Sequence, residues 1–436
     1  MDIQKWTSVR RQLHQHPETG FAEEKTAARI AESLRTMGIS VEQGIGKTGV
    51  VGLLQGKRPG QRMIGLRADM DALPMQEQGS SAWASSTAGV AHACGHDGHI
   101  VMLLACAETL ARNPDFSGSV CFIFQPAEEG LAGARAMIDD GLFSRYPCDA
   151  VYAIHNWPEL PLGELRTRPG PMMAAADRFD ITLSGGGGHA AQPHLSPDTL
   201  LATSELVVAL NSLVPRTLNP HEAALLTVTQ IHGGTSHNMI PAAATITGTV
   251  RTFSPQARDT LERQLRLKTE HISAASGLHA EIRYHRYYPA TCNSPRETRL
   301  ALAAAERAGL IAQQADYPAL TSEDFSFMLQ EKPGAYVWLG SGPGYPLHHP
   351  CFDFNDQAIP SAVRWPCEVL YGESDGLQTR RPLQTRSAGA IFRQRRKRVC
   401  PLPAGSSSGR PAAPSPGHNT PHTPWHRHRG IDQWYS

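Results

Sequence analysis

Two apolar strands with a helix between them limit the fold of this chain more than any other feature. Residues 120–124 and 150–154 are apolar along their whole length, and residues 132–138 between them have helical apolar spacing. Strands without a polar face are buried on both sides, and a strand–helix–strand order joins parallel strands. We therefore predict an α/β fold: a sheet domain with helices on both faces.

Polar side chains stand where the predicted strands end. The first strand is followed by Glu128 and Glu129, and the second by His155. Ligands of open α/β sheets bind beyond the carboxyl ends of the strands, so these side chains are expected at one rim of the sheet. A strand at residues 63–66 leads to Asp69, which we expect to orient a ligand histidine at the same rim.

Residues 92–99 add a thiol, three imidazoles and a carboxylate within one short stretch. Thiolates and neutral imidazoles are preferred ligands of zinc-like ions. Cys94 and His96 alone would be more typical of a packed core, but the strand-end residues supply the ligands that this pair lacks. A last strand at residues 336–339 leads toward His348 and His349, and we expect one of the two to bind metal.

These candidates are too many for a single structural zinc ion, which takes four ligands, and they suit two ions that share one ligand. We favour the Cys94 thiolate as the shared ligand. Glu128 and Glu129 are adjacent, so we expect one to bind metal and the other to remain free. A metal lowers the pKa of its water from about 15.7 to about 7, and a free carboxylate takes the proton and later returns it to a leaving amine. The predicted chemistry is metal-assisted hydrolysis of an amide.

The predicted elements divide the chain into a sheet domain and an inserted small domain. Residues 177–288 follow the order β-α-β-β-α-β, which is the ferredoxin-like motif. We assign residues 1–175 and 290–364 to the catalytic domain and residues 176–289 to the insertion. From about residue 365 the chain becomes rich in basic residues, Pro, Ser, Gly and His, and core-forming periodicity fades. We predict that residues 365–436 form a disordered tail.

Composition excludes several classes of function. The net charge of +1 gives no reason to expect a nucleic-acid partner for the body of the protein. No apolar run is long enough for a membrane span, and the polar N-terminus does not have the form of a signal peptide. The 8 cysteines have no paired spacing, which favours a reducing compartment. We expect a cytoplasmic enzyme with no membrane partner.

The chain resembles the metal-dependent N-acyl-amino-acid amidohydrolases, a family that includes hippurate hydrolases, auxin-conjugate hydrolases and related peptidases with a co-catalytic metal pair. The matching motifs occur in one order from residue 5 to about residue 363. They are Arg11–Glu18, Arg67–Pro74, His92–His99, Gln125–Glu129, Ile154–Pro158, Gly188–Ala191, His237–Pro241, Gly248–Arg251, Ser322–Phe325 and Leu347–Pro350.

The resemblance implies a role for each site residue. Glu128 would be the catalytic base. The ligands of two divalent ions (Mn²⁺, Zn²⁺, Co²⁺ or Ni²⁺) would be Cys94, His96, Glu129, His155 and His348, which selects His348 over His349. His189 would polarise the scissile carbonyl, and Asn238 and Arg251 would hold the carboxylate of the substrate. The resemblance also implies a homodimer formed through the small domain.

Two rival functions stay open at this point. A dipeptidase or aminopeptidase of the same fold would bind a free α-amino group in place of an acyl group. A damaged, inactive copy would bind metal without catalysis. The second rival is favoured by the C-terminus, where the family continues into a closing helix and the pattern of this chain decays after about Val363. We hypothesise that the tail from about residue 365 is a frameshifted or otherwise foreign reading.

Overall fold

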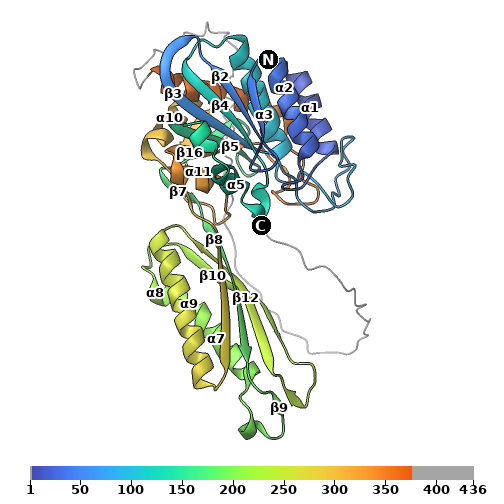
Figure 1. Ribbon diagram of the computed structural model, residues 1–436, viewed down its shortest axis with the longest axis vertical. Helices are drawn as coiled ribbons and strands as arrows, with labels where there is room; N and C mark the ends of the chain where they lie inside the picture. The colour runs from blue at the N-terminus through green and yellow to red at the C-terminus, as the bar shows by residue number, and fades with distance from the viewer. Residues whose placement is uncertain (1, 376–436) are drawn as a thin grey trace, which may run out of the picture. The chain divides into compact units, whose positions relative to one another are not determined.

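The computed structural model describes residues 2–375 of the 436-residue chain. Its larger sheet is mixed and eight-stranded, and the four central strands β4, β3, β5 and β16 are parallel to their neighbours in this group (Figure 1). In spatial order the strands are β1 (Ser40–Ile45), β2 (Gly49–Gln55), β4 (Ser117–Gln125), β3 (Arg58–Asp69), β5 (Ala150–Trp157), β16 (Gly334–Gly340), β6 (Glu164–Thr167) and β15 (Ile311–Gln314). The predicted parallel sheet is confirmed.

Both faces of this sheet are buried, as the uniformly apolar strands require. Alternate residues of β4 belong to different cores: Phe122 packs with one cluster and Ile123 with the other. The first face is covered by α1 (Ile3–Gln15), α2 (Glu24–Thr36), α3 (His96–Arg112), α10 (Pro295–Arg307) and α12 (Ile359–Asp375). The second face carries α5 (Gly133–Asp139), α6 (Leu142–Arg145) and α11 (Phe325–Glu331).

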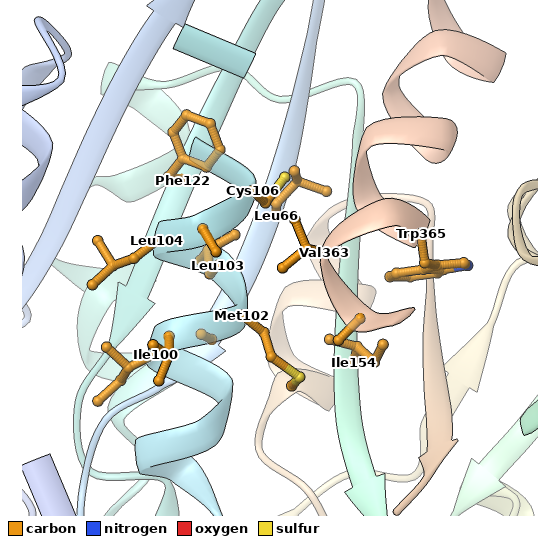
Figure 2. Packing of buried hydrophobic residues seen from close by; sticks show 14 of the residues in the cluster. Leu66, Ile100, Met102, Leu103, Leu104, Cys106, Phe122, Ile154, Val363 and Trp365 are labelled. Carbon is orange, nitrogen blue, oxygen red and sulfur yellow. The ribbon is translucent and has the colours of Figure 1, made fainter. Parts of the chain in front are cut away.

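Helix α12 corrects the predicted start of the tail. The helix runs to Asp375, so the predicted boundary at residue 365 is wrong: residues 365–375, which we assigned to the tail, are helical. Trp365, Val369 and Leu370 are buried in the core beside α3, and the Trp365 indole donates to Ala301 O at 3.0 Å. Figure 2 shows Val363 and Trp365 in this core with Met102 and Cys106 of α3.

Pro366 is the residue that obscured the pattern, because proline interrupts helical spacing. The closing helix is therefore present. The remainder of the predicted tail, residues 376–436, lies outside the described part of the chain. Within the described part, no helix combines the length and the apolar character that crossing a bilayer needs.

A second, antiparallel sheet is formed by residues of the predicted insertion. Its strands lie in the order β10 (Ala224–Gly233), β12 (Ala243–Thr252), β8 (Ala175–Ser184) and β13 (His279–Tyr288). Helices α7 (Thr199–Asn211), α8 (Leu213–Thr217) and α9 (Pro255–Ala275) pack on it around Phe179, Leu206 and Leu261. The order of elements along the chain is the β-α-β-β-α-β order expected from the sequence; the exact boundaries at residues 176 and 289 stay predictions.

Short elements complete the described chain. They are α4 (Glu128–Leu131), β7 (Gly170–Met173), β9 (Gly188–His189), the 3-10 turn Pro193–Leu195, β11 (Met239–Ile240), β14 (Thr291–Asn293) and the 3-10 turn Asp356–Ala358. Strands β9 and β11 pair with each other, as do β7 and β14.

Candidate metal centre and active site

The candidate ligands come from segments at one rim of the large sheet. Cys94 and His96 flank the start of α3, Glu129 lies just beyond β4, and His155 lies near the end of β5. The sharp entry into α3 depends on Gly95, whose φ is +93°. A Cβ there would lie 2.2 Å from Asn156 Oδ1, so only glycine fits between the two ligands.

The donor atoms of these residues face one another. The Cys94 Sγ lies 3.4 Å from His155 Nε2, and Glu129 Oε1 lies 3.9 Å from His96 Nε2 and 3.3 Å from His348 Nε2. His348 is held in place by its backbone N–H, which donates to Ala93 O at 2.8 Å. Ligand atoms of Cys94, His96 and Glu129 lie within 4.8 Å of one another. This joins the contacts into one cluster of all five residues that the resemblance implied as ligands. His349 points elsewhere: its ring stacks on Tyr345.

Backbone carbonyls orient two of the imidazoles. His96 Nδ1 lies 2.9 Å from Asp71 O, and His155 Nδ1 lies 2.7 Å from Asn156 O. A carbonyl only accepts, so each Nδ1 carries the proton and each Nε2 presents a lone pair to the cluster. Such outer partners are typical of metal-binding histidines.

Two polar atoms of the cluster are buried and have no hydrogen-bond partner among residues 2–375: His96 Nε2 and Glu129 Oε1. Leaving a buried polar atom unsatisfied costs about 1–3 kcal/mol, so a pair that faces each other indicates a missing partner. Although burial opposes a charge on His96, Asp69 and Asp71 raise its pKa to about 10, which reflects a strongly negative surrounding. Soft and hard donors in such a field fit divalent transition ions.

Asp71 positions both halves of the Glu128–Glu129 pair. Its two carboxylate oxygens accept the backbone N–H groups of Glu128 and Glu129, each at 3.0 Å. Tyr288 donates its hydroxyl to Glu128 O at 2.6 Å. This role of Asp71 was not predictable, because an aspartate at a strand end does not reveal which amides it will contact.

The carboxyl group of Glu128 has an unusual electrostatic environment. Burial, followed by the nearby carboxylates of Glu323 and Glu129, raises the pKa of Glu128 well above its usual range. A carboxylate with a raised proton affinity can take a proton near neutral pH and give it up again. Glu128 is therefore the candidate for proton transfer, and its role as the general base stays a prediction.

A buried ion cluster lies next to Glu128. Arg67 donates to Asp69 Oδ2 at 2.7 Å, to Glu323 Oε1 at 2.8 Å and to Asp324 Oδ1 at 3.1 Å, and all of these side chains are buried. Burying several like charges requires such a counter-charge. The sequence motifs contained Arg67, Glu323 and Asp324, but nothing in their spacing indicated that they would meet.

Asp69 lies beside the ligands, where the sequence placed it. Its Oδ2 is 3.7 Å from His96 Nε2, but its Oδ1 accepts from His99 Nδ1 at 2.6 Å. His99 Nε2 in turn accepts the N–H of Asn156 at 3.0 Å. Asp69 therefore orients His99 and lies close to His96. Its predicted role as an orienter of a ligand stays a prediction.

The three predicted substrate-binding residues have different surroundings. His189 and Asn238 are exposed, and their side chains accept hydrogen bonds from Ala191 N at 3.0 Å and Ser236 Oγ at 2.5 Å. Arg251 on β12 donates to Val250 O at 3.3 Å, and burial lowers the pKa of its guanidinium, with Asp177 opposing this effect. These contacts are local, and the substrate roles stay predictions.

Known proteins share both the sequence and the fold. The model of peptidase family M20/M25/M40 matches residues 65–371. N-acetyl-L-cysteine deacetylase of Bacillus subtilis is 40% identical over 356 residues, covering 81% of this chain and 84% of the relative. Hippurate hydrolase of Campylobacter jejuni is 38% identical over 370 residues, covering 84% of this chain and 96% of the relative.

A solved structure supports the metal centre. A dinuclear metal-binding peptidase of the M20 family from Bacillus subtilis is 33% identical, with a TM-score of 0.77, covering 86% of this chain and 99% of that one. Family motifs, fold and a converging donor set agree. The chain belongs to peptidase family M20/M25/M40 and is a metal-dependent amidohydrolase.

Proposed function

We propose that this enzyme hydrolyses the amide bond of N-acyl or N-aroyl amino acids and that Glu128 is its general base. The observation that carries the proposal is the meeting of five donor residues, Cys94, His96, Glu129, His155 and His348, beside the carboxylate of Glu128. The names of the relatives, an N-acetyl-L-cysteine deacetylase and a hippurate hydrolase, support an acylated amino acid as the substrate class.

Two divalent ions, of which Mn²⁺, Zn²⁺, Co²⁺ and Ni²⁺ are the candidates, would be held by the five donor residues. When bound, they would polarise the amide carbonyl and acidify a water. The unpartnered His96 Nε2 and Glu129 Oε1 fit this role, as does the Cys94 thiol, which burial and Glu129 keep protonated by raising its pKa until a cation compensates the charge.

The protein groups then handle the protons. The Glu128 carboxylate takes a proton from the attacking water and delivers it to the leaving amine nitrogen, so that Glu128 ends each turnover ionised. Asp71 keeps the Glu128 backbone fixed while the proton moves, because both of its oxygens are engaged by the adjacent amides. Burial keeps bulk water from competing for the proton.

His189, Asn238 and Arg251 belong to the proposal as substrate-binding residues. An arginine fork meets a carboxylate with two hydrogen bonds. In the described part of the chain, the guanidinium of Arg251 has no carboxylate among its hydrogen-bond partners. We also propose a homodimer through the small domain. Its support is the edge position of β10 together with Ile231 on that strand and Val208 on α7, which are 52% and 73% exposed.

A substrate panel with metal analysis tests the proposal. Purified protein is stripped with chelator, reloaded separately with Mn²⁺, Co²⁺, Ni²⁺ or Zn²⁺, and offered N-acetyl- and N-benzoyl-amino acids beside free dipeptides. We expect hydrolysis of the blocked substrates, its loss on chelation and its return on reloading. Preference for free dipeptides would support a peptidase instead, and indifference to chelator would refute the metal centre.

The adjacent histidines offer a matched pair of variants. His348→Ala should lose bound metal and activity, whereas His349→Ala should keep both, because the His349 ring stacks on Tyr345 and accepts from Cys351 N. Equal metal content in the two variants would refute the choice of His348. A folded, metal-loaded wild type that hydrolyses nothing in the panel would favour the inactive copy.

A further inference from the structure

We propose that Glu23 is a positioning residue that holds the catalytic base Glu128 in place through the backbone of Ala127. The inference rests on the proposed function, because it assigns Glu23 a part in the same reaction. Glu23 precedes Ala127 by 104 residues and is completely buried. It stands at the N-cap of α2, but its side chain makes no hydrogen bond to that helix. Its carboxylate therefore serves another purpose.

Both oxygens of the Glu23 carboxylate are engaged. Oε1 accepts the backbone N–H of Ala127 at 2.8 Å, and Oε2 accepts the hydroxyl of Thr48 at 2.6 Å. Burial raises the pKa of Glu23 to about 7, and in the ionised form both hydrogen bonds are stronger than neutral ones. Burial also protects them from competing water. One oxygen thus holds the residue directly before the base, while the other fixes the carboxylate itself.

The backbone of Ala127 needs such an anchor. Ala127 has φ 54° and ψ 45°, a left-handed conformation that costs a residue with a Cβ about 1–2 kcal/mol. A turn of this kind aims successive amides toward anions. Here the N–H of Ala127 meets Glu23, and the next two, of Glu128 and Glu129, meet Asp71. Two buried carboxylates therefore hold three consecutive amides around the base.

The segment that carries Glu23 is itself tied to the active-site loops. Thr19 pairs with Ala72, and Ala72 N donates to Glu18 O at 2.8 Å, directly beside Asp71. A Cβ on Gly20 would lie 3.0 Å from both Cα and Cβ of Ala127, so this segment lies against the turn. Any displacement of Glu23 would consequently reach the turn that aims Glu128.

Substitutions at Glu23 separate this role from general stability. Glu23→Gln keeps an acceptor for Ala127 N–H, and its amide can donate to the Thr48 hydroxyl, which also accepts. Glu23→Ala removes the acceptor and frees the turn. A matched control is Glu108→Ala, which removes another buried glutamate. Its partners are Lys5 and Trp6 on α1 and Arg112 on α3.

The experiment compares these variants with wild type on the N-acyl amino acid that wild type hydrolyses best. Readouts are kcat, KM, bound metal per chain, the melting temperature and hydrogen exchange of residues 126–130. A misplaced catalytic group costs about a hundredfold per ångström, so we expect Glu23→Ala to lower kcat by about ten- to a hundredfold. KM and bound metal should be unchanged, and the Ala127 amide should exchange faster. Glu23→Gln should recover most of the kcat, and Glu108→Ala should lower only the melting temperature.

Three results would overturn the inference: wild-type kcat in Glu23→Ala, an equal loss in Glu23→Gln, or a loss of bound metal that explains the fall in kcat. If Glu23→Ala does not fold, Thr48→Val, which leaves Oε2 of Glu23 without its donor, takes its place. Thr48→Val should show a smaller fall in kcat than the fall expected for Glu23→Ala, together with faster hydrogen exchange of the Ala127 amide. Wild-type values of both kcat and this exchange rate would refute the proposal. If the wild type hydrolyses no N-acyl amino acid, the proposed function itself is refuted. If the wild type is active and Glu23→Ala has the same kcat, only the role of Glu23 is refuted.

Discussion

The motif residues at the rim of the large sheet contact one another, whereas those of the predicted insertion make only local side-chain contacts within the described part of the chain. At the rim, residues far apart in the chain meet in a buried place, and His96 Nε2 and Glu129 Oε1 have no hydrogen-bond partner among the described residues. In the predicted insertion, the side chains of His189 and Asn238 are exposed, and among the described residues their hydrogen bonds go to residues two positions away. The fold brings the candidate metal ligands together, whereas the predicted substrate-binding residues make only local side-chain contacts within the described part of the chain.

The largest effect should come from the rim. Glu128→Gln keeps the shape of the base but loses its ability to take a proton, so kcat should fall by about 10²–10⁴-fold. Bound metal should stay at the wild-type level because Glu128 is not a proposed ligand. Activity assays with metal analysis check this. The neighbouring variant Glu129→Gln should differ, because it should lose both activity and bound metal. Wild-type kcat in Glu128→Gln would move the base to another residue.

The difference between the regions also explains how much the sequence could predict. Apolar strands, helix spacing and residues following the strand ends predicted the α/β sheet and brought Cys94, Glu129 and His155 to one rim. This succeeded because parallel strands with helical crossovers have their carboxyl ends on one edge, so position in the chain determines position in space.

Contacts that depend on side-chain direction were not predictable in this way. The spacing of Asp71 did not reveal that it would accept two amides beyond β4, and that of Arg67 did not reveal its meeting with Glu323. Glu23 and Ala127 are brought together by the packing of a loop against a left-handed turn, which no periodicity encodes. Helix α12 was missed because Pro366 interrupts a pattern that core packing nevertheless sustains.

A buried histidine near the rim should make stability depend on pH. Although burial opposes its charge, Asp97 and Glu77 raise the pKa of His14 to about 9. Its stabilising charge is therefore fully present below the unfolded value near 6.5 and is lost as pH rises through about 9. Urea unfolding is measured at pH 6.5 and at pH 9. Between these values the free energy of unfolding of wild type should fall by up to about 3 kcal/mol, and that of His14→Gln should not show this fall.

The matched control for this measurement comes from the small domain. His189→Gln changes an exposed histidine and should keep the full wild-type loss of stability between the two pH values. The same loss in His14→Gln as in wild type would show that other groups cause the pH dependence. The buried, hydrogen-bonded His14 and the exposed His189 would then not differ in their effect on the pH dependence of stability.

A smaller effect is expected from a substitution of Asp69, which tests whether this residue contributes to metal binding. Asp69→Asn keeps the shape but removes the charge that faces His96 and the acceptor strength that orients His99. Removing a partner behind a metal ligand typically weakens metal binding by about 10–100-fold. Competition with a metal-binding dye measures the change. An unchanged affinity would show that Asp69 supports only Arg67 and His99.

The smallest effect should come from the small domain and should be confined to substrate binding. Arg251→Lys keeps the positive charge but loses the planar fork, so KM for an N-acyl amino acid should rise by about tenfold while the free energy of unfolding changes by less than about 0.5 kcal/mol. The matched control is Arg283→Lys on β13, where the arginine is paired with Glu281. For an N-acyl amino acid amide, which offers no carboxylate, Arg251→Lys and wild type should have the same KM. A tenfold rise with both substrates would mean that Arg251 does not bind the carboxylate, and the small domain would then contribute to the reaction in another way.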